Sequence, residues 1–201
     1  MAIPNILIIN GALGGNVGNT GELLALAEEA MAGKATVSYL ELVRQPTMDR
    51  ILEAVTAADG FIFGTGTYWD SWGSPMQTFL EMTAHTEGED LWVGKPAGVI
   101  VTAHAVGAKG IVSRLLGVLN VYGMVIPPFA GIAYTWANEV ALPHASDHLR
   151  NELWTPKDVA VICHNVLEVA KGTSDWMHWP SNSGRYGEKW LHAYSASRDS
   201  N

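Results

Sequence analysis

The sequence predicts an α/β fold in three layers, in which helices cover both faces of a parallel sheet of five strands. Short apolar runs of strand length alternate with longer segments whose apolar side chains recur at helical spacing. Parallel strands need crossover connections, and those connections are usually helices. In addition, the loops after the first, third and fourth predicted strands are rich in glycine, threonine or aromatic residues. Such loops meet at one edge of a parallel sheet, where ligands bind.

The first unit consists of a strand, a loop and a helix. Residues 6–9 form a continuous apolar run between Asn5 and Asn10, which is typical of a strand buried on both faces. After a glycine-rich loop, apolar side chains from Leu23 to Met31 recur at helical spacing.

The remaining elements follow from the same two patterns. Residues 37–42 alternate apolar and polar side chains, which suits an edge strand with one face in water. Two helices carry start signals, with Ser74 and Thr155 as N-caps and Pro75 and Pro156 at the first helical position. The remaining predicted strands are residues 61–63, 97–101 and 124–126; two prolines interrupt the last of these, and it continues at 132–136. The helices predicted after the first one, including the two with these start signals, are residues 48–58, 76–83, 111–122 and 154–171.

We expect one domain at residues 1–172, followed by an extension at residues 173–201. A chain of 201 residues suits a single core, and 48% hydrophobic with 16% charged residues is typical of a globular protein. The extension lies outside the alternation of strands and helices. We expect it to pack on the domain or on a partner subunit, because it contains Trp176, Trp179, Tyr186, Trp190 and Tyr194.

Charge and cysteine usage exclude several classes of protein. The formal net charge of -8 argues against nucleic acid and against anionic membrane surfaces as partners. The single cysteine, Cys163, excludes a disulfide within the chain and is compatible with a reducing cytoplasm. The N-terminus lacks the pattern of a signal peptide, and no apolar run approaches the length of about 18 residues that a membrane span needs. We therefore expect a cytoplasmic protein.

The first loop, residues 11–20, has the composition of an anion site. Its glycines let backbone amides turn inward, and the following helix adds its N-terminus. The loop matches neither a Walker P-loop nor G-x-G-x-x-G, and no Lys or Arg precedes Lys34, which favours a monophosphate held by neutral groups. A turn that merely links strand to helix is the alternative. The candidate phosphate-binding residues are Gly11, Ala12, Asn16, Gly18, Asn19 and Thr20.

The second loop, residues 64–73, combines small residues with aromatic ones. Aromatic side chains at the mouth of a sheet can flank a planar cofactor, and nearby amides can bond to its heteroatoms. The alternative is that these aromatics belong to the core or to a subunit contact. The candidate residues are Thr65, Gly66, Thr67, Tyr68, Trp69 and Asp70.

The third loop, residues 102–110, is built from small residues that let the backbone approach a ring. Its two ionisable residues are His104, which either donates to a ligand or is structural, and Lys109, which either faces solvent or meets a phosphate of a nicotinamide cofactor. The candidate residues are Thr102, Ala103, His104, Gly107 and Lys109. No metal site is predicted, because the other histidines lack metal-ligand spacing.

From about Ile6 to Pro128 the chain resembles the flavodoxin-like NAD(P)H-dependent oxidoreductases, which include FMN reductases and NAD(P)H:quinone oxidoreductases. The resemblance rests on residues 8–11 with 18–20, on residues 64–69 followed by 76–80, and on residues 107–110 with 123–127. It implies a flavodoxin-like sandwich with strand order 2-1-3-4-5, FMN as cofactor and NAD(P)H as co-substrate. The first loop would bind the FMN phosphate, the second the ribityl chain and ring, and the third the pyrimidine side of the ring.

The resemblance implies an enzyme in which NAD(P)H gives a hydride to the flavin and a small acceptor, such as a quinone or free flavin, takes the electrons. Tyr68, Trp69 and His104 are expected to position the substrate, with no residue required as an acid or base. We expect a homodimer or homotetramer. The alternatives are a flavodoxin-type electron carrier and a flavin-free interaction protein on the same fold. Asp70 stands where the family commonly has glycine, and its carboxylate, if close to the ring, would lower the flavin potential.

Overall fold

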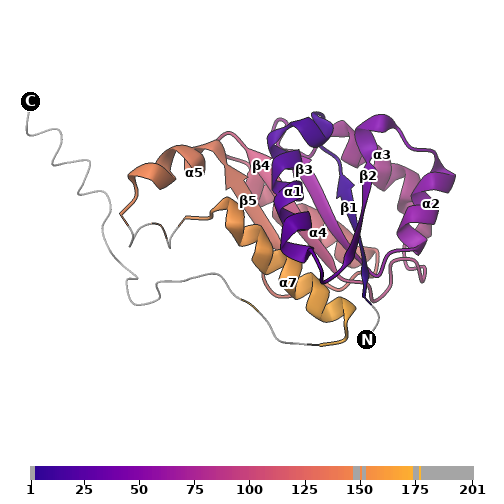
Figure 1. Ribbon diagram of the computed structural model, residues 1–201. Coiled ribbons are helices and arrows are strands. Elements are labelled where there is room, and N and C mark those ends of the chain that lie inside the picture. The colour runs from indigo at the N-terminus through magenta and orange to yellow at the C-terminus, as the bar shows by residue number, and fades with distance from the viewer. Residues whose placement is uncertain (1–2, 147–149, 151–152, 174–176, 178–201) are drawn as a thin grey trace, which may run out of the picture.

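A sheet of five parallel strands in the order β2-β1-β3-β4-β5 forms the centre of the molecule (Figure 1). The structure is a computed structural model that describes residues 3–146, 150, 153–173 and 177. The predicted fold class and strand order are confirmed. The strands are β1 (Asn5–Asn10), β2 (Thr36–Glu41), β3 (Gly60–Gly66), β4 (Ala97–Ala103) and β5 (Gly131–Thr135).

Helices cover both faces of the sheet and bury two separate apolar clusters against it (Figure 1). One face carries α1 (Asn19–Met31) and α7 (Val159–Ala170), and the other carries α2 (Met48–Thr56), α3 (Ser74–Thr83) and α4 (Ala108–Val121). A short helix, α5 (Trp136–Ala141), follows β5 directly. The 3₁₀ helices are η1 (Gly15–Val17), η2 (Leu42–Arg44), η3 (Ala84–Thr86), η4 (Leu142–His144) and η5 (Pro156–Asp158).

The strands show the burial that their sequence patterns predict. All seven residues of β3 are buried, and five of the six residues of β1 are, because helices cover both sides of each strand. The edge strand β2 alternates exposed with more buried residues, as its alternating sequence indicates. The three central strands therefore form a rigid base for the loops that leave their carboxyl ends.

Two local predictions were wrong. Residues 124–126 do not form a strand: Val125 makes only an isolated bridge to Pro96, and the fifth strand begins at Gly131. Pro127 and Pro128 explain the break, since proline has no amide to donate to a ladder. Ser74 is not the cap of α3 either. Gly73 takes the N-cap position in an extended conformation, and Ser74 is the first helical residue.

Aromatic packing fills the core on the face of α3 and α4. Trp92 is fully buried and packs edge-on against Phe79 and Tyr122, at 6.3 and 5.3 Å between ring centroids. The indole Nε1 donates to the hydroxyl of Thr86 at 2.9 Å, so the buried polar atom is satisfied.

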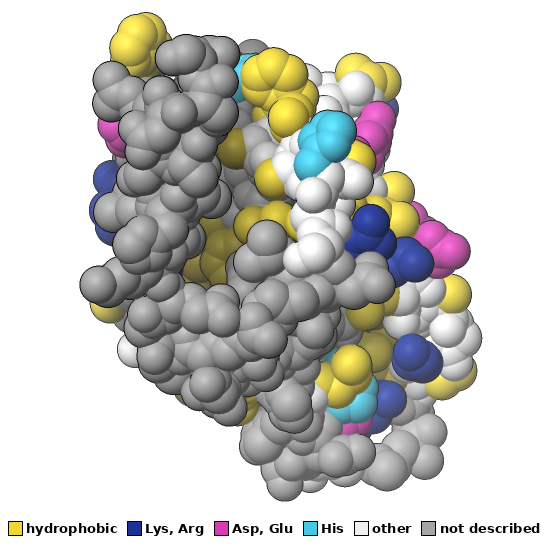
Figure 2. Space-filling model, turned by 90° about the vertical axis from the view of Figure 1, so that its left-hand side faces the viewer, with side chains coloured by type: hydrophobic (Ala, Val, Ile, Leu, Met, Phe, Trp, Pro, Cys, Tyr) yellow, Lys and Arg dark blue, Asp and Glu magenta, His cyan; other side chains and the backbone are white. Residues whose placement is uncertain are grey.

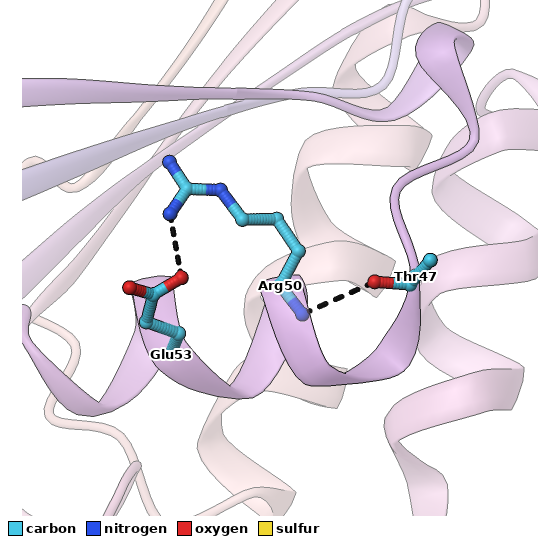
Figure 3. A network of polar contacts seen from close by, with 3 residues as sticks. All are labelled: Thr47, Arg50 and Glu53. Atoms are coloured by element: carbon cyan, nitrogen blue, oxygen red, sulfur yellow. Dashed lines mark hydrogen bonds and ion pairs between the residues drawn. The ribbon is translucent and has the colours of Figure 1, made fainter.

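Helix α2 begins at a side-chain cap that Figure 3 shows close up. The hydroxyl of Thr47 accepts a hydrogen bond from the Arg50 amide at 3.4 Å, and the Arg50 guanidinium pairs with the Glu53 carboxylate at 2.7 Å (Figure 3). The cap satisfies an amide of the first turn that has no partner within the helix.

Helix α7 closes the described part of the chain. It continues η5, where Thr155 is the N-cap that the sequence predicts and forms a capping box with Asp158, and Gly172 follows α7 with a φ of +72°. On its buried side, Asn165 donates to the carbonyls of Pro128 and Met177 and accepts from the Met177 amide. Apart from Thr173 and Met177, the predicted aromatic extension lies outside the described residues.

Candidate functional site

A cleft of about 800 Å³ opens at the carboxyl ends of the strands. The parallel register places Gly66 of β3 beside Thr102 of β4, and Thr102 beside Tyr134 of β5, so the loops leave the sheet at one level. The residues that line the cleft are Ala12, Gly14, Gly18, Asn19, Thr20, Glu22, Leu23, Leu26, Gly66, Thr67, Tyr68, Thr102, Ala103, His104, Tyr134, Thr135, Trp136, Glu139 and Pro156.

The first loop leads to a helix N-terminus that no side chain caps. Gly18 is the N-cap of α1, in an extended conformation and without a side-chain hydrogen bond. The amides of Asn19 and Thr20 come before the first residue that can bond within the helix, Glu22, whose amide bonds to the Gly18 carbonyl at 3.1 Å. These first-turn amides, together with the helix dipole, can therefore attract an anion.

Asn10, which was not among the predicted site residues, holds the first loop in shape. This fully buried residue accepts a hydrogen bond from the Ala12 amide at 3.1 Å and donates to the Asn16 side chain at 2.9 Å. Gly21 has no room for a side chain, because a Cβ there would lie 2.5 Å from the Asn16 carbonyl oxygen. A polar residue at the end of an apolar strand was the signal that could have identified Asn10.

The second loop contains a tight turn with unusual backbone angles. The amide of Tyr68 bonds to the Ser71 carbonyl at 2.8 Å, and the Ser71 amide bonds back to Tyr68 at 3.0 Å. Between them Trp69 and Asp70 have φ values of 49° and 59°. Two consecutive left-handed residues define a type I′ turn, which normally takes Asn-Gly. This strained turn leaves the side chain of Trp69 fully exposed.

Hydrogen bonds tie the loops to one another. The Tyr68 hydroxyl accepts from the Leu13 amide of the first loop at 3.1 Å, and the hydroxyls of Thr20 and Thr102 lie 2.7 Å apart. The Thr65 hydroxyl accepts from the Gly73 amide at 3.0 Å and so fixes the start of α3. The cleft is therefore shaped before a ligand enters it.

The hydroxyl of Thr67 is the exception among these polar groups. Its Oγ1 is buried and has no hydrogen-bond partner in the described part of the structure, although Thr67 lines the cleft. Leaving such a group unpaired costs about 1–3 kcal/mol, so it points to a ligand that completes the site.

The third loop meets the second through Gly107. This glycine has a φ of +88°, and a Cβ on it would lie 2.1 Å from the Asp70 carboxylate. The Arg114 guanidinium of α4 donates to the Asp70 carbonyl and lies 5.3 Å from the Trp72 ring centroid. Asp70 thus packs against the third loop and does not line the cleft.

A fourth wall of the cleft comes from β5 and α5, which the sequence analysis left out of the site. The Tyr134 hydroxyl donates to the Glu139 carboxylate, and burial followed by this bond raises the pKa of Tyr134 above its ordinary value. Trp136 lies edge-on to His104, with 6.1 Å between ring centroids. The signal for this wall was topological: the continuation at residues 132–136 ends at the same edge as the other strands.

Ten of the seventeen predicted cofactor-binding residues line the cleft, and seven do not. Of the seven, Gly11 is buried against Met76, Asn16 bonds to Asn10, and Lys109 is exposed at the start of α4. The seven predicted residues outside the cleft lining are Gly11, Asn16, Thr65, Trp69, Asp70, Gly107 and Lys109. Direct contact of either group with a cofactor stays a prediction.

The charge of the cleft is negative. Among the described residues that line it, Glu22 and Glu139 are the carboxylates and neither Lys nor Arg is present.

In the described part of the chain, no three His, Cys, Asp or Glu side chains gather as a metal site would require. Figure 2 shows the end of the molecule that carries α5, where histidine side chains lie beside hydrophobic ones. No helix formed by the described residues is long and apolar enough to span a membrane.

Comparison with known families assigns the chain. The model of the family described as NADPH-dependent FMN reductase matches residues 4–137. The chain belongs to this family. It is therefore an oxidoreductase that contains FMN and takes electrons from NAD(P)H, as the sequence resemblance implies. None of the curated proteins searched matches it.

Solved structures share the fold at low sequence identity. The NAD(P)H:(acceptor) oxidoreductase FerB from Paracoccus denitrificans is 18% identical with a TM-score of 0.64, covering 85% of this chain and 98% of that one. A WrbA-like flavodoxin from Agrobacterium tumefaciens is 16% identical with a TM-score of 0.62, covering 85% and 99%. The Flv1 flavodiiron core from Synechocystis sp. PCC6803 is 19% identical with a TM-score of 0.61, and the match covers 85% of this chain but only 36% of that protein.

Proposed function

We propose that this flavoenzyme passes electrons from NAD(P)H to a small organic acceptor, such as a quinone or free flavin, with FMN held in the cleft. The observation that carries the proposal is that the unpaired Thr67 hydroxyl and the uncapped N-terminus of α1 belong to one cleft of about 800 Å³. That volume falls within the range of about 300–1,000 Å³ for pockets that hold small molecules and cofactors.

The first turn of α1 would hold the phosphate of FMN. The amides of Asn19 and Thr20, with the side chain of Asn19, supply donors to the phosphate oxygens, and the helix dipole favours the negative charge. Because no cation lines the described cleft and Glu22 lies in the same turn, the phosphate would depend on these neutral donors alone.

The second and third loops would hold the ring. The Thr67 hydroxyl can donate to or accept from a ring heteroatom, while Tyr68 and His104 line the space where a substrate would stack. FMN, when bound, supplies the redox chemistry, and the chain supplies binding, orientation and electrostatics. Trp69, fully exposed beside the cleft, is proposed to position the substrate or to contact a second copy of the chain.

We also propose a reducing, cytoplasmic location and a homodimer or homotetramer. Burial raises the pKa of the Cys163 thiol to about 12, so the only cysteine stays protonated and unreactive at neutral pH.

Size-exclusion chromatography with light scattering measures the oligomeric state, and a monomer would contradict the proposed homodimer or homotetramer.

The spectrum of the purified protein tests the proposed function. We expect flavin absorption bands after loading with FMN, and bleaching of those bands when NADH or NADPH is added without oxygen. Addition of a quinone should restore the bands. Absence of bands after loading would exclude a flavoenzyme, and bleaching without turnover on any small acceptor would favour an electron carrier.

Thr67→Val tests the ring site because it should affect the stability of the FMN-free protein and the affinity for FMN in opposite directions. Valine fills the same space without an unpaired hydroxyl, so the free energy of unfolding of the FMN-free protein should stay the same or rise. The loss of one hydrogen bond to the ring should weaken FMN binding by about tenfold, measured by flavin fluorescence titration. Equal FMN affinity in both proteins would remove Thr67 from the site.

A further inference from the structure

One wall of the cleft has no role in the FMN site proposed above. Tyr134, Thr135, Trp136 and Glu139 line the cleft from the end of β5 and the start of α5. We call these four residues the outer wall. In Figure 1 this part of the chain lies at the end of the sheet away from β2.

Hydrogen bonds fix the outer wall without a ligand. The Thr135 hydroxyl caps α5 by accepting from the Asn138 amide at 3.1 Å, and the Ala137 amide donates to the His104 carbonyl at 3.1 Å. The Tyr134 hydroxyl donates to Glu139. A wall that is already ordered costs a ligand little conformational entropy on binding.

The outer wall offers an aromatic surface. Trp136 is 64% exposed although it packs edge-on against His104, at an interplanar angle of 83°. Its exposed indole can contact a flat ring by stacking, and indole faces also attract cations.

The outer wall is also negatively charged. Glu139 follows Trp136 by three residues in α5 and also lines the cleft, and Glu22 adds a second carboxylate from α1. The described residues that line the cleft include no Lys or Arg to balance them. An anionic ligand would therefore be repelled here, while a cation would gain from both the carboxylate and the indole.

We propose that the outer wall binds the electron acceptor and favours flat aromatic acceptors that are neutral or positively charged over anionic ones. This inference rests on the proposed function, because it assigns one wall of that same cleft to the acceptor. A quinone that binds there takes up two electrons and two protons to become a hydroquinone. The hydride of NAD(P)H supplies both electrons and one proton, and water supplies the second proton.

The test uses the FMN-loaded enzyme with saturating NADH and three acceptors on one ring system. These are 1,4-naphthoquinone, its 2-sulfonate, and a naphthoquinone that carries a trimethylammonium group. Because such substituents also change the quinone's own reactivity, the quantity compared is the ratio of kcat/KM for the cation to that for the sulfonate, in each protein variant.

Glu139→Gln should lower this cation-to-sulfonate ratio by about fivefold, the effect of one charge near a protein surface. The matched control is Glu29→Gln, the same change on an exposed residue of α1 that does not line the cleft, and it should leave the ratio unchanged. Trp136→Ala should raise KM for all three quinones. Equal ratios in the Glu139 and Glu29 variants would overturn the inference.

Two further measurements separate this inference from the proposed function. Anaerobic stopped-flow reduction of the flavin by NADH should proceed in wild type and at the same rate in the control Glu29→Gln; if wild type itself is not reduced, it is the proposed function that fails. Calorimetry on the oxidised, FMN-loaded protein should show binding of the redox-inert cation N-benzylpyridinium, weakened about fivefold by Glu139→Gln. Equal affinity for toluenesulfonate would contradict the charge selection.

Discussion

Trp69 and Asp70 adopt backbone conformations in this site that their residue types disfavour. Both have left-handed backbone angles that side chains with a Cβ adopt at a cost of about 1 kcal/mol or more. The surroundings impose the turn: paired backbone bonds between Tyr68 and Ser71, and the Arg114 guanidinium on the Asp70 carbonyl. No composition rule for turns predicts Trp-Asp here, because the cause lies in contacts with residues far away in the sequence.

Gly107→Ala should destabilise the protein more than Gly33→Ala does. Both glycines have positive φ values, so each alanine variant should lose about 1 kcal/mol from backbone strain. A Cβ at Gly107 also meets the Asp70 carboxylate at 2.1 Å, whereas nothing lies within 4 Å of one at Gly33. Urea unfolding of the FMN-loaded protein measures the difference.

The excess cost at Gly107 should disappear when its cause is removed. In the Asp70→Gly background the carboxylate is absent, so Gly107→Ala should cost no more than Gly33→Ala costs there. If the excess persists in that background, the contact between the second and third loops is not its source.

Most helices and strands could be predicted from local pattern alone. Continuous apolar runs identified β1, β3 and β4, and helical spacing identified α1 and α2, because these elements bury the faces that their sequences show. Two predictions failed for different reasons. Val125 has strand-like sequence but pairs only once, because Pro127 and Pro128 follow it and cannot extend a ladder. Gly73 replaces Ser74 as cap because a nonlocal contact decides the structure there: the Thr65 hydroxyl holds the Gly73 amide.

At helix α2 the cap should matter more than the ion pair (Figure 3). Thr47→Ala removes the hydroxyl that accepts from the Arg50 amide and should cost about 1 kcal/mol. Glu53→Gln breaks a pair whose side chains are 60% and 70% exposed, and should change the free energy of unfolding little. Thermal and urea unfolding of both variants measure this, and a larger loss in Glu53→Gln would refute the ranking.

The candidate site is formed by segments from along the whole chain and not by a single sequence motif. The three glycine- and aromatic-rich loops were predictable because parallel strands end at one edge, and ten of their candidate residues do line the cleft. The fourth wall could not be predicted with the same certainty, since Tyr134 and Glu139 carry no compositional signal. Only the register that places Tyr134 beside Thr102 brings that wall to the cleft.

Alkaline pH should destabilise the molecule as a whole. Burial raises the pKa of Cys163 to about 12 and raises the pKa values of Tyr39, Tyr122 and Tyr134. These groups bind their protons more tightly in the folded protein, so the stability they contribute is complete below about pH 8. It falls at higher pH as the unfolded chain loses protons. Lys95 acts in the opposite direction, because burial lowers its pKa.

The midpoint of urea unfolding, measured between pH 8 and pH 11, should therefore decrease with pH. Cys163→Ala removes one of the four groups with raised pKa and should make the decrease with pH shallower. The lost packing of the side chain lowers the free energy of unfolding equally at every pH and does not change this slope. A midpoint that rises with pH, or an unchanged slope in Cys163→Ala, would contradict this account.

The ties between the loops, meaning their hydrogen bonds and packing contacts, limit how the cleft can be altered by selection or by design. Leu13 bonds to Tyr68, Asp70 packs on Gly107, and Thr20 meets Thr102, so each loop is braced by another. An insertion or a graft in one loop would leave its neighbours with broken contacts. Variants with new substrate ranges should therefore arise by coordinated changes across loops, or on the face of α5, which those three ties do not bind.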